Sequence, residues 1–565
     1  MIEAFTAAQV RAAEEPLLAR GVPLMERAAF ALATIVAGDL RRTAARGRSA
    51  RARDAGPDGG ARPGRVTGTR VVLLVGSGNN GGDALFAGAY LSRRGVAVEA
   101  VCTSEHPHAD GLTALRRAGG GVLDLTAPAA RARWGQAVEG ILSADVVVDG
   151  LIGIGASGAL RGVAGELVEA LADRLSGWAS RGAPRPWVVA VDTPSGIGVD
   201  DGSVPGPVLR ADRTVTFGAP KPGLLLPPAT HLAGHVTPVD VGLDELGTPA
   251  VRRLEPADVA RLWPVPGASD QKYTRGVLGV VAGTPTFPGA AVLAVTAAVR
   301  AGVGMVRYRG PDDVARAVVS ARPEAVPAEG RVQAWALGSG VPAAGERSGL
   351  RDGASERDTG SGPDAGQHER LRYALAVACG ELAQDAWDAS AGPRPACVVD
   401  AGALSLLPAT CPPSVVLTPH AGELASLLRA RGEDVDREAV EAEPLRWART
   451  AHELTGATVL LKGSATVVVG PEGVWSQADG PAWLATAGAG DVLTGLLGAL
   501  LAAYGERVVR EPGLAAELAA AAATVHGLAA ARANPGGPVA AMDVAEAIPG
   551  VVADLLRGDG PEGSR

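Results

Sequence analysis

The sequence predicts two α/β domains, each built on a doubly wound sheet of mostly parallel strands. With 565 residues, the chain is too long for one ordinary hydrophobic core. Hydrophobic residues make up 47% and aromatic residues 3%, with 77 glycines, which favours close helix–strand packing over an aromatic-rich β fold. Strand-like runs alternate with helix-like segments along the whole chain, as crossover connections between parallel strands require.

In the first half, three apolar and β-branched runs each end in glycine or polar residues. They are TRVVLLVGSG (69–78), DVVVDGLIG (145–153) and PWVVAVDTPSG (186–196). Runs of this kind are typical of buried parallel strands. The helical pattern GDALFAGAYLSRRG (82–95) follows the first run.

The same order restarts after residue 250 with a second set of strand-like runs. These are GVLGVVAG (276–283), RVQAWALGSG (331–340), ACVVDAGAL (396–404), SVVLTPHAGE (414–423) and ATVLLKGSATVVVG (457–470). We therefore expect one domain over residues 1–250 and a second over residues 251–565.

Two stretches, 41–68 and 342–370, are rich in small, polar or charged residues without periodicity. We expect both to be flexible surface insertions. For the arginine-rich part, 41–65, contact with an acidic partner is the alternative.

The charge and the cysteines limit the function classes. A net charge of −8 gives no polybasic face, so neither nucleic acid nor an anionic membrane is expected as a partner. The four cysteines lack CxxC spacing and are expected to be reduced thiols that bind no metal. The start of the sequence lacks a secretory signal, and the alanine-rich stretch 514–533 is too weakly apolar for a membrane span. We expect a soluble, cytoplasmic protein.

Polar residues follow all three strand-like runs of the first half. GNNGGD places Asn79, Asn80 and Asp83 after the first run, while Asp149 and Asp192 end the other two. Amides and carboxylates at converging strand ends can coordinate a hard cation or hold hydroxyl and phosphate oxygens. A turn with Asp as a helix N-cap is the alternative for the first of these motifs.

In the second half, the stretch LATAGAGDVLTGLLGALLAAYG (484–505) places a charged Asp491 at the start of a very apolar helix. Its glycine amides could hold a phosphate at the positive end of the helix dipole, with Asp491 as the proton acceptor. Packing with an Asp cap is the alternative. Lys462, His420 and Gly340 follow three other strand-like runs, whereas His526 lies inside a helical pattern and is expected to be structural.

The first half resembles the NAD(P)HX epimerase family through GNNGGD, VVVDGLIGIG, VDTPSG and ADRTVTFGAPKPGLLL, in that order. The resemblance implies a Rossmann-like domain that interconverts the R and S epimers of hydrated NADH and NADPH. It implies K⁺ ligands at Asn80, Asp149 and Ser195, and Asp192 is the acid/base candidate. The implied substrate contacts are Asn79, Asn80, Gly81, Gly82, Asp83, Gly153, Ile154, Gly155, Ala156, Ser157, Gly158, Ala159 and Asp192. Lys221, in GAPKPG, is expected to be a solvated surface lysine, with a phosphate contact as the alternative.

The second half resembles the ADP/ATP-dependent NAD(P)H-hydrate dehydratases through TFPGAAVLAV, VVDAGAL, TPHAGE, LLKGSATVVV, AGAGD and VHGLAA. The resemblance implies a ribokinase-like fold in which the hydroxyl of the hydrated ring is phosphorylated and phosphate then leaves. It implies ADP, or ATP, as donor, and Mg²⁺ is expected from phosphoryl transfer. The implied nucleotide contacts are Lys462, Gly463, Ser464, Ala465, Thr466, Gly488, Ala489 and Gly490, and the substrate contacts are Ala290, Gly340, His420 and Asp491. Ala489 replaces the threonine of the family's GTGD motif.

The resemblances together imply a repair enzyme that acts on NADHX and NADPHX and releases AMP and phosphate in its second step. A homo-oligomer is possible. Two alternatives stay open: a ribokinase-like small-molecule kinase, and a first half that only binds a ligand.

Overall fold

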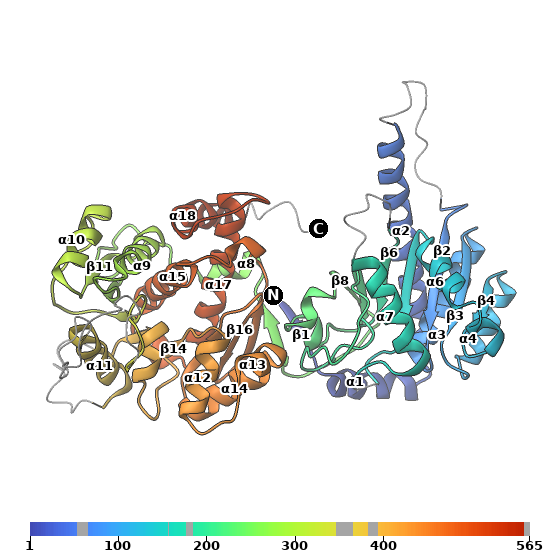
Figure 1. Cartoon of the computed structure of the whole chain (residues 1–565), viewed down its shortest axis with the longest axis horizontal. Coiled ribbons are helices and arrows are strands. Elements are labelled where there is room, and N and C mark those ends of the chain that lie inside the picture. Colours follow the sequence, from blue (N-terminus) through green and yellow to red (C-terminus); the bar gives the residue numbers. More distant parts are fainter. Residues whose placement is uncertain (53–65, 156–157, 177–184, 346–364, 382–393, 559–565) are drawn as a thin grey trace, which may run out of the picture. The chain divides into compact units, whose positions relative to one another are not determined.

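The structure, a computed structural model, describes residues 1–52, 66–155, 158–176, 185–345, 365–381 and 394–558. These residues form two compact units (Figure 1). The first is Glu3–Ala250, and the second is Val251–Arg565 together with Met1–Ile2. Each unit is an α/β fold around its own sheet, so the predicted fold class is confirmed.

The first unit contains a seven-stranded parallel sheet in the order β4-β3-β2-β5-β6-β7-β8. Its strands are β2 (Arg70–Val75), β3 (Ala97–Cys102), β4 (Gly121–Asp124), β5 (Val146–Gly150), β6 (Trp187–Val191), β7 (Arg213–Phe217) and β8 (His235–Val239). The chain moves outward from β2 to β4 and then returns to the other side of β2 at β5. The switch point of this doubly wound sheet therefore lies between β2 and β5.

Helices cover both faces of this sheet, because the three predicted runs form strands whose alternate side chains enter two separate buried clusters. Val71, Leu73 and Val75 belong to one cluster, Val72 and Leu74 to the other. The helices are α1 (Ala7–Ala19), α2 (Leu24–Ala52), α3 (Asn79–Arg93), α4 (Ala109–Arg117), α5 (Pro128–Arg131), α6 (Trp134–Leu142) and α7 (Gly162–Ser176).

The expected flexible insertion at 41–68 is wrong in its first part. Helix α2 continues through residue 52, and its last turns project from the sheet (Figure 1). The stretch is rich in alanine and arginine, which are strong helix formers, so low hydrophobicity here does not mean absence of structure. Residues 53–65 lie outside the described residues.

The second unit contains a ten-stranded mixed sheet in the order β1-β9-β17-β16-β15-β14-β13-β12-β10-β11. Strands β10 to β15 are parallel to one another. Strand β16 is antiparallel to both of its neighbours, β15 and β17. The strands are β1 (Ile2–Ala4), β9 (Val251–Arg253), β10 (Val277–Val281), β11 (Met305–Tyr308), β12 (Ala334–Leu337), β13 (Ala396–Val399), β14 (Val415–Leu417), β15 (Thr458–Leu461), β16 (Thr466–Gly470) and β17 (Gly473–Gln477).

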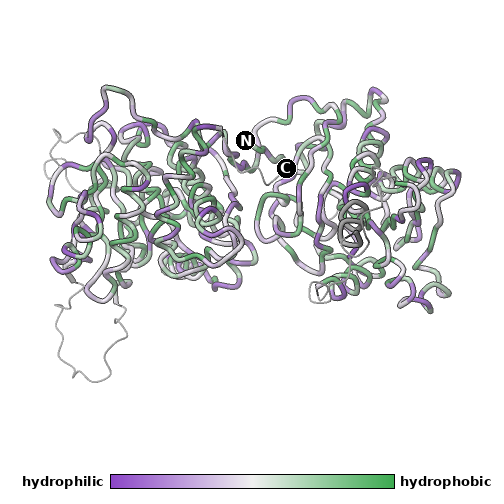
Figure 2. The backbone as a smooth tube through the Cα atoms, turned by 90° about the horizontal axis from the view of Figure 1, so that it is seen from above, coloured by the Kyte–Doolittle hydropathy of each residue, from purple (hydrophilic) through white to green (hydrophobic). Residues whose placement is uncertain are grey.

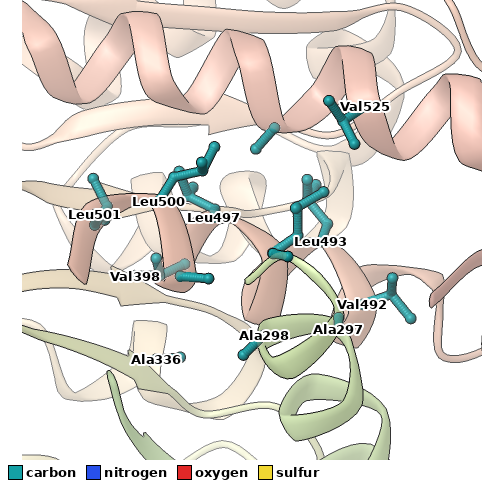
Figure 3. Close-up of a cluster of buried hydrophobic side chains, with 14 of the residues drawn as sticks. Ala297, Ala298, Ala336, Val398, Val492, Leu493, Leu497, Leu500, Leu501 and Val525 are labelled. Atoms are coloured by element: carbon teal, nitrogen blue, oxygen red, sulfur yellow. The ribbon is translucent and has the colours of Figure 1, made fainter. Parts of the chain in front are cut away.

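The core of the second unit is built around α15 (Ala489–Tyr504), the helix predicted after AGAG. Its leucines lie in one buried cluster with side chains of α9 (Pro288–Arg300), β13 and α17 (Leu514–Ala533) (Figure 3). The other helices are α8 (Pro256–Leu262), α10 (Asp312–Ala321), α11 (Ala365–Cys379), α12 (Ala421–Ala430), α13 (Arg437–Ala442), α14 (Pro444–Thr455), α16 (Glu506–Arg510) and α18 (Ala541–Arg557). Apolar stretches run through the interior of each unit, with hydrophilic stretches in the outer turns (Figure 2).

Helices α11 and α17 bear on two other expectations about the second unit. Helix α11 begins at Ala365, inside the expected insertion 342–370, and its Gln367 is buried; residues 346–364 lie outside the described residues. By length and composition α17 could cross a membrane, but 78% of its apolar window is buried inside the unit, as in the core helix of a soluble protein.

Candidate active sites in the two units

The first candidate site lies at the carboxyl ends of β2, β5 and β6, which are neighbours in the sheet. Asn80 lies in the first turn of α3, directly after β2, and Asp149 ends β5. Asp192 follows β6 and has a φ of 66°, a left-handed conformation that non-glycine residues rarely adopt. The fold therefore brings these predicted site residues to one edge, at the switch point where open α/β sheets bind their ligands.

Asp149 and Ser195 form a buried, fully bonded pair. The Ser195 hydroxyl donates to Asp149 Oδ1 at 2.6 Å, and the Ser195 backbone N–H donates to Oδ2 at 2.9 Å. Burial raises the pKa of Asp149, and these hydrogen bonds partly offset the effect. Asn80 joins the same cluster, because its side-chain nitrogen donates to the carbonyl oxygens of Val191 at 2.7 Å and Ile152 at 3.0 Å.

This cluster fits the donor set that a hard cation requires. Asn80 contacts the Ile152 and Val191 carbonyls, Ser195 contacts the Ile152 carbonyl and Asp149, and all of these groups carry an oxygen. Gly153 also belongs here, since a Cβ at that position would lie 2.5 Å from Asn80 Oδ1. Only glycine leaves the Asn80 amide its space.

Lys221 is not the solvated surface residue that its proline- and glycine-rich loop suggests; that expectation is wrong. It is 1% exposed, and its ammonium donates to Asp192 Oδ1 at 2.5 Å, Phe217 O at 2.9 Å and Thr216 Oγ1 at 3.2 Å. Three acceptors use all three donors of the ammonium group. Lys221 therefore holds the carboxylate of Asp192 instead of meeting a phosphate.

Two more carboxyl groups face this pair. Asp83 is buried, and its Oδ1 has no hydrogen-bond partner among the described residues. Burial, followed by the charges of Asp192 and Glu14, raises the pKa of Asp83 well above its ordinary value. Burial also raises the pKa of Glu14, on α1. The site thus combines an ion-paired carboxylate with two carboxyl groups whose pKa values burial raises, which suits acid–base chemistry.

The remaining predicted substrate residues of the first unit surround this edge in part. Asn79 and Gly155 are exposed, whereas Gly81 and Gly82 are buried at the start of α3. Ile154 and Ala159 are half-buried, and Gly158 is exposed. Ala156 and Ser157 lie outside the described residues.

The second candidate site lies at the carboxyl ends of β12, β13, β14 and β15, which are consecutive in the sheet. Gly340, Asp400, His420 and Lys462 follow these four strands in that order. The N-terminus of α15 joins them, because a Cβ on Gly490 would lie 3.3 Å from the Lys462 ammonium. The start of α15 and the Lys462 charge therefore lie close together, and both favour a phosphoryl group.

Asp491, the predicted proton acceptor, is a partly desolvated carboxyl group at this turn. Burial, followed by the charge of Asp400, raises its pKa to about 6, while a hydrogen bond from Ser339 and the charge of Lys462 oppose the rise. A pKa just below neutral suits a general base, which must accept a proton and release it again.

Lys462 is held by two carboxylates. Its ammonium donates to Asp400 Oδ1 at 2.7 Å and lies 3.8 Å from Glu423 Oε2. Burial alone lowers the pKa of Lys462, but these two charges outweigh it, and the pKa is raised. The remaining predicted nucleotide residues follow at the β15–β16 turn: Gly463 and Ser464 are exposed, Ala465 is buried and Thr466 begins β16.

His420, a predicted substrate contact, is the N-cap of α12. Its Nδ1 accepts from the Gly422 and Glu423 N–H groups at 3.1 and 3.2 Å, so a neutral ring carries its proton on Nε2. The side chain is 58% exposed, and it can donate from Nε2 to a ligand. The cap and the ligand roles are therefore compatible.

Ala290 and Gly340 are in contact, since a Cβ on Gly340, at a φ of 66°, would lie 2.4 Å from the Ala290 Cβ. Gly488, the N-cap of α15, is also left-handed, at 87°. His526 is buried within α17 as expected. Burial lowers its pKa to about 4, against a hydrogen bond to the Ala489 backbone. His526, on α17, thus supports the AGAG turn through its hydrogen bond to Ala489.

Sequence reasoning missed Asp400 and Ser339 and assigned Lys221 wrongly. Asp400 ends the run ACVVD just as Asp149 ends DVVVD and Asp192 ends VVAVD, so the same strand-end rule could have found it. Lys221 and Ser339 gave no comparable signal, because their importance depends on contacts across the fold.

Comparison with known proteins adds two family matches. Residues 22–223 match the family described as YjeF-related protein N-terminus, and residues 278–549 match the family described as NAD(P)H-hydrate dehydratase. The chain is 40% identical over 511 residues to the bifunctional NAD(P)H-hydrate repair enzyme Nnr of Mycobacterium tuberculosis, covering 87% of this chain and 88% of that protein. The corresponding enzyme of Mycobacterium leprae is 39% identical over 552 residues, covering 94% of each.

Relatives of single halves are also known. The NAD(P)H-hydrate epimerase of Clavibacter sepedonicus is 43% identical over 261 residues, covering 44% of this chain and 95% of that protein. Among solved structures, the ADP/ATP-dependent NAD(P)H-hydrate dehydratase of Bacillus subtilis covers 54% of this chain and 99% of its own, with a TM-score of 0.41 and 23% identity.

Proposed function

The chain belongs to the bifunctional NAD(P)H-hydrate repair enzymes, and from this membership we propose how its two units divide the work. The first unit interconverts the R and S epimers of NADHX and NADPHX. The second unit dehydrates the S epimer to NADH or NADPH. The similarity of the mycobacterial repair enzymes over both halves of the chain carries this proposal.

In the first unit, Asp192 is the acid/base residue of epimerisation. Moving a hydroxyl group between the two faces of the hydrated ring requires a proton to be taken and returned. Asp192 is held by Lys221 at the strand edge, and the nearby Asp83 favours its protonated form. The residues Asn79–Asp83 and Gly153–Ala159 hold the substrate around this pair.

Asn80, Asp149 and Ser195 would hold K⁺, together with the Ile152 and Val191 carbonyl oxygens that Asn80 and Ser195 contact. The ion supplies positive charge next to the substrate-binding loops when it is bound. The chain's own groups order the Ile152 loop, because the Ser195 hydroxyl accepts from the Ile152 N–H at 3.1 Å.

In the second unit, the substrate hydroxyl oxygen attacks the terminal phosphoryl group of ADP. A new P–O bond forms, the bond to AMP breaks, and Asp491 accepts the hydroxyl proton. Loss of phosphate from the ring carbon, with loss of a proton from the neighbouring carbon, then restores the double bond of NAD(P)H. The products are NAD(P)H, AMP and phosphate, so the net reaction balances.

The Lys462 ammonium and the Gly488–Gly490 amides stabilise the transferring phosphoryl group, while Ala290, Gly340 and His420 contact the hydrate. Within the described part of the chain, no three His, Cys, Asp or Glu side chains are arranged to hold a metal ion. We therefore propose that Mg²⁺ enters with the nucleotide phosphates and supplies charge neutralisation there.

The kinase alternative has no observation in its favour. We place the enzyme in the cytoplasm, where its substrates form, with ADP as the donor and ATP as the competitor to test.

The decisive experiment mixes the full chain with racemic NADHX, ADP, Mg²⁺ and K⁺ and follows the absorbance of regenerated NADH. Conversion of both epimers is expected for the wild type. Asp192→Asn should stop when the S epimer is consumed, and Asp491→Asn should form no NADH. A parallel run replaces ADP with ATP. Absence of NADH with either nucleotide would refute the function.

A further inference from the structure

Asp400, at the end of β13, is a buried carboxylate to which neither the resemblance nor the mechanism above gives a role. It is 2% exposed and lies at the centre of the strand edge. Its Oδ1 accepts from Lys462 Nζ at 2.7 Å and from Thr418 Oγ1 at 3.0 Å. Its Oδ2 lies 3.4 Å from Ser339 Oγ. Each of these three donors follows a different strand: β15, β14 and β12.

The contact with Lys462 fixes a flexible side chain at a useful place. A lysine ammonium is a compact charge on a stem with four rotatable bonds, so its position depends on its partners. Here Asp400 holds the ammonium beside Gly490, at the start of α15. Glu423, the other carboxylate near Lys462, is more distant, at 3.8 Å. Asp400 is therefore the main anchor of the charge that faces the phosphoryl site.

Ser339 connects Asp400 to the general base. Its hydroxyl is buried, and it forms hydrogen-bonding contacts with both Asp400 and Asp491. A hydroxyl has one proton to donate. The Ser339 hydroxyl, 3.4 Å from Asp400 Oδ2, can donate this proton to either carboxylate, and its contact with Asp491 lowers the pKa of Asp491.

From these contacts we infer that Asp400 and Ser339 are positioning residues of the dehydratase reaction. Asp400 holds Lys462 at the phosphoryl site, and Ser339 holds the carboxylate of Asp491 toward the substrate hydroxyl. This inference rests on the dehydratase function proposed for the second unit. Neither residue belongs to the substrate or nucleotide contacts named above.

The inference predicts opposite effects on the titration of Asp491. The groups that act on Asp491 are Asp400, Ser339, Lys462 and Glu423. Asp400→Asn keeps an oxygen for Lys462 but removes a negative charge, so the pKa of Asp491 should fall. Ser339→Ala removes the stabilising hydrogen bond, so that pKa should rise.

The test measures kcat for S-NADHX with ADP against pH, using the full chain. The acid limb of the profile should move to lower pH in Asp400→Asn and to higher pH in Ser339→Ala, by roughly one pH unit in total. The value of kcat should fall on the order of 10-fold in each variant, with little change in KM for the hydrate. Thr494→Val is the matched control. It removes a buried hydroxyl from α15, the helix that carries Asp491, and that hydroxyl has no partner among the described residues.

A second measurement reads the same titration without turnover. Asp491→Asn is added to each variant and to the wild type, and the Tm is measured against pH with and without this second substitution. The difference between the two Tm values reports how Asp491 titrates in the folded state. Opposite displacements of the two curves support the inference. Curves that coincide with wild type, or that move in the same direction, overturn it. If the wild type forms no NADH while these curves separate, the proposed function fails, whereas the coupling of Asp400 and Ser339 to Asp491 stands.

Discussion

Lys221 and Asp192 form an ion pair of 2.5 Å in which the side chains are 1% and 8% exposed. The lysine has no donor left for a ligand, since Thr216 and Phe217 accept its other protons. A buried pair of this kind adds little stability overall, but loss of one partner leaves an unpaired buried charge. Lys221 is therefore best understood as the support of Asp192.

Lys221→Met should remove most epimerase activity and destabilise the first unit by about 3 kcal/mol, because Asp192 loses its counter-charge while the aliphatic volume is kept. Thermal unfolding and R-to-S conversion of NADHX are the measurements. Lys272→Met, at an exposed lysine, is the control and should change neither. Normal epimerisation by Lys221→Met would show that the pair is dispensable.

Asp83→Asn should stabilise the ligand-free chain at neutral pH. The folded-state pKa of Asp83 is raised well above its ordinary value. Its contribution to stability is therefore present below the unfolded-state pKa and is lost as pH rises through the folded-state pKa. Asparagine has no charge to bury, so its Tm advantage should be absent near pH 4 and grow toward pH 8. Asp110→Asn, at an exposed site on α4, should show no such trend. An advantage independent of pH would contradict the argument.

Potassium should raise the Tm of the full chain and its epimerase rate, because the oxygen cluster around Ile152 binds it only in the folded state. The comparison uses KCl against choline chloride at equal ionic strength. Ser195→Ala removes one oxygen of the cluster, and the potassium effect should shrink severalfold while dehydration of pure S-NADHX continues. If potassium changed the Tm and the epimerase rate of the variant and the wild type equally, the ion would bind at another site.

Gly495→Ala should destabilise the second unit, although alanine is favoured over glycine in most helix interiors by about 1 kcal/mol. A Cβ at position 495 would lie 2.0 Å from the Ala294 carbonyl oxygen of α9. The two helices would have to separate, and we expect a loss of about 1–3 kcal/mol. Urea unfolding measures it. Gly135→Ala, where a helical Cβ would meet nothing within 4 Å, should be neutral or stabilising.

The sequence predicted the fold well, because buried parallel strands leave a continuous apolar signature. Each predicted run contains a strand, and the helix after AGAG begins at Ala489. The same signature marks where strands end, so Asp149, Asp192 and Lys462 could be placed at the two edges in advance. The roles of these residues in the reactions stay predictions.

What could not be predicted depends on contacts between distant segments. Lys221 lies in a loop whose composition suggests solvent, yet the fold encloses it beside Asp192, 29 residues away in sequence. Ser339 and Asp400 are 61 residues apart and meet only because β12 and β13 are adjacent. The prediction for the end of α2 failed for a local reason. Alanine and arginine have high helix propensity, so they can form a helix that has no apolar face.

Among the described residues, the buried cluster around α15 spans positions 254–555 and shares no residue with the buried clusters of the first unit, which lie between positions 5 and 241. Each aspartate that we propose as catalytic accordingly depends on a scaffold of its own. A single carboxylate-to-amide substitution should then separate the two functions. Asp192→Asn should leave a chain that cannot use the R epimer, and Asp491→Asn a chain that can dehydrate neither epimer. Introduced into living cells, such a pair would reveal which of the two damaged forms accumulates and limits growth.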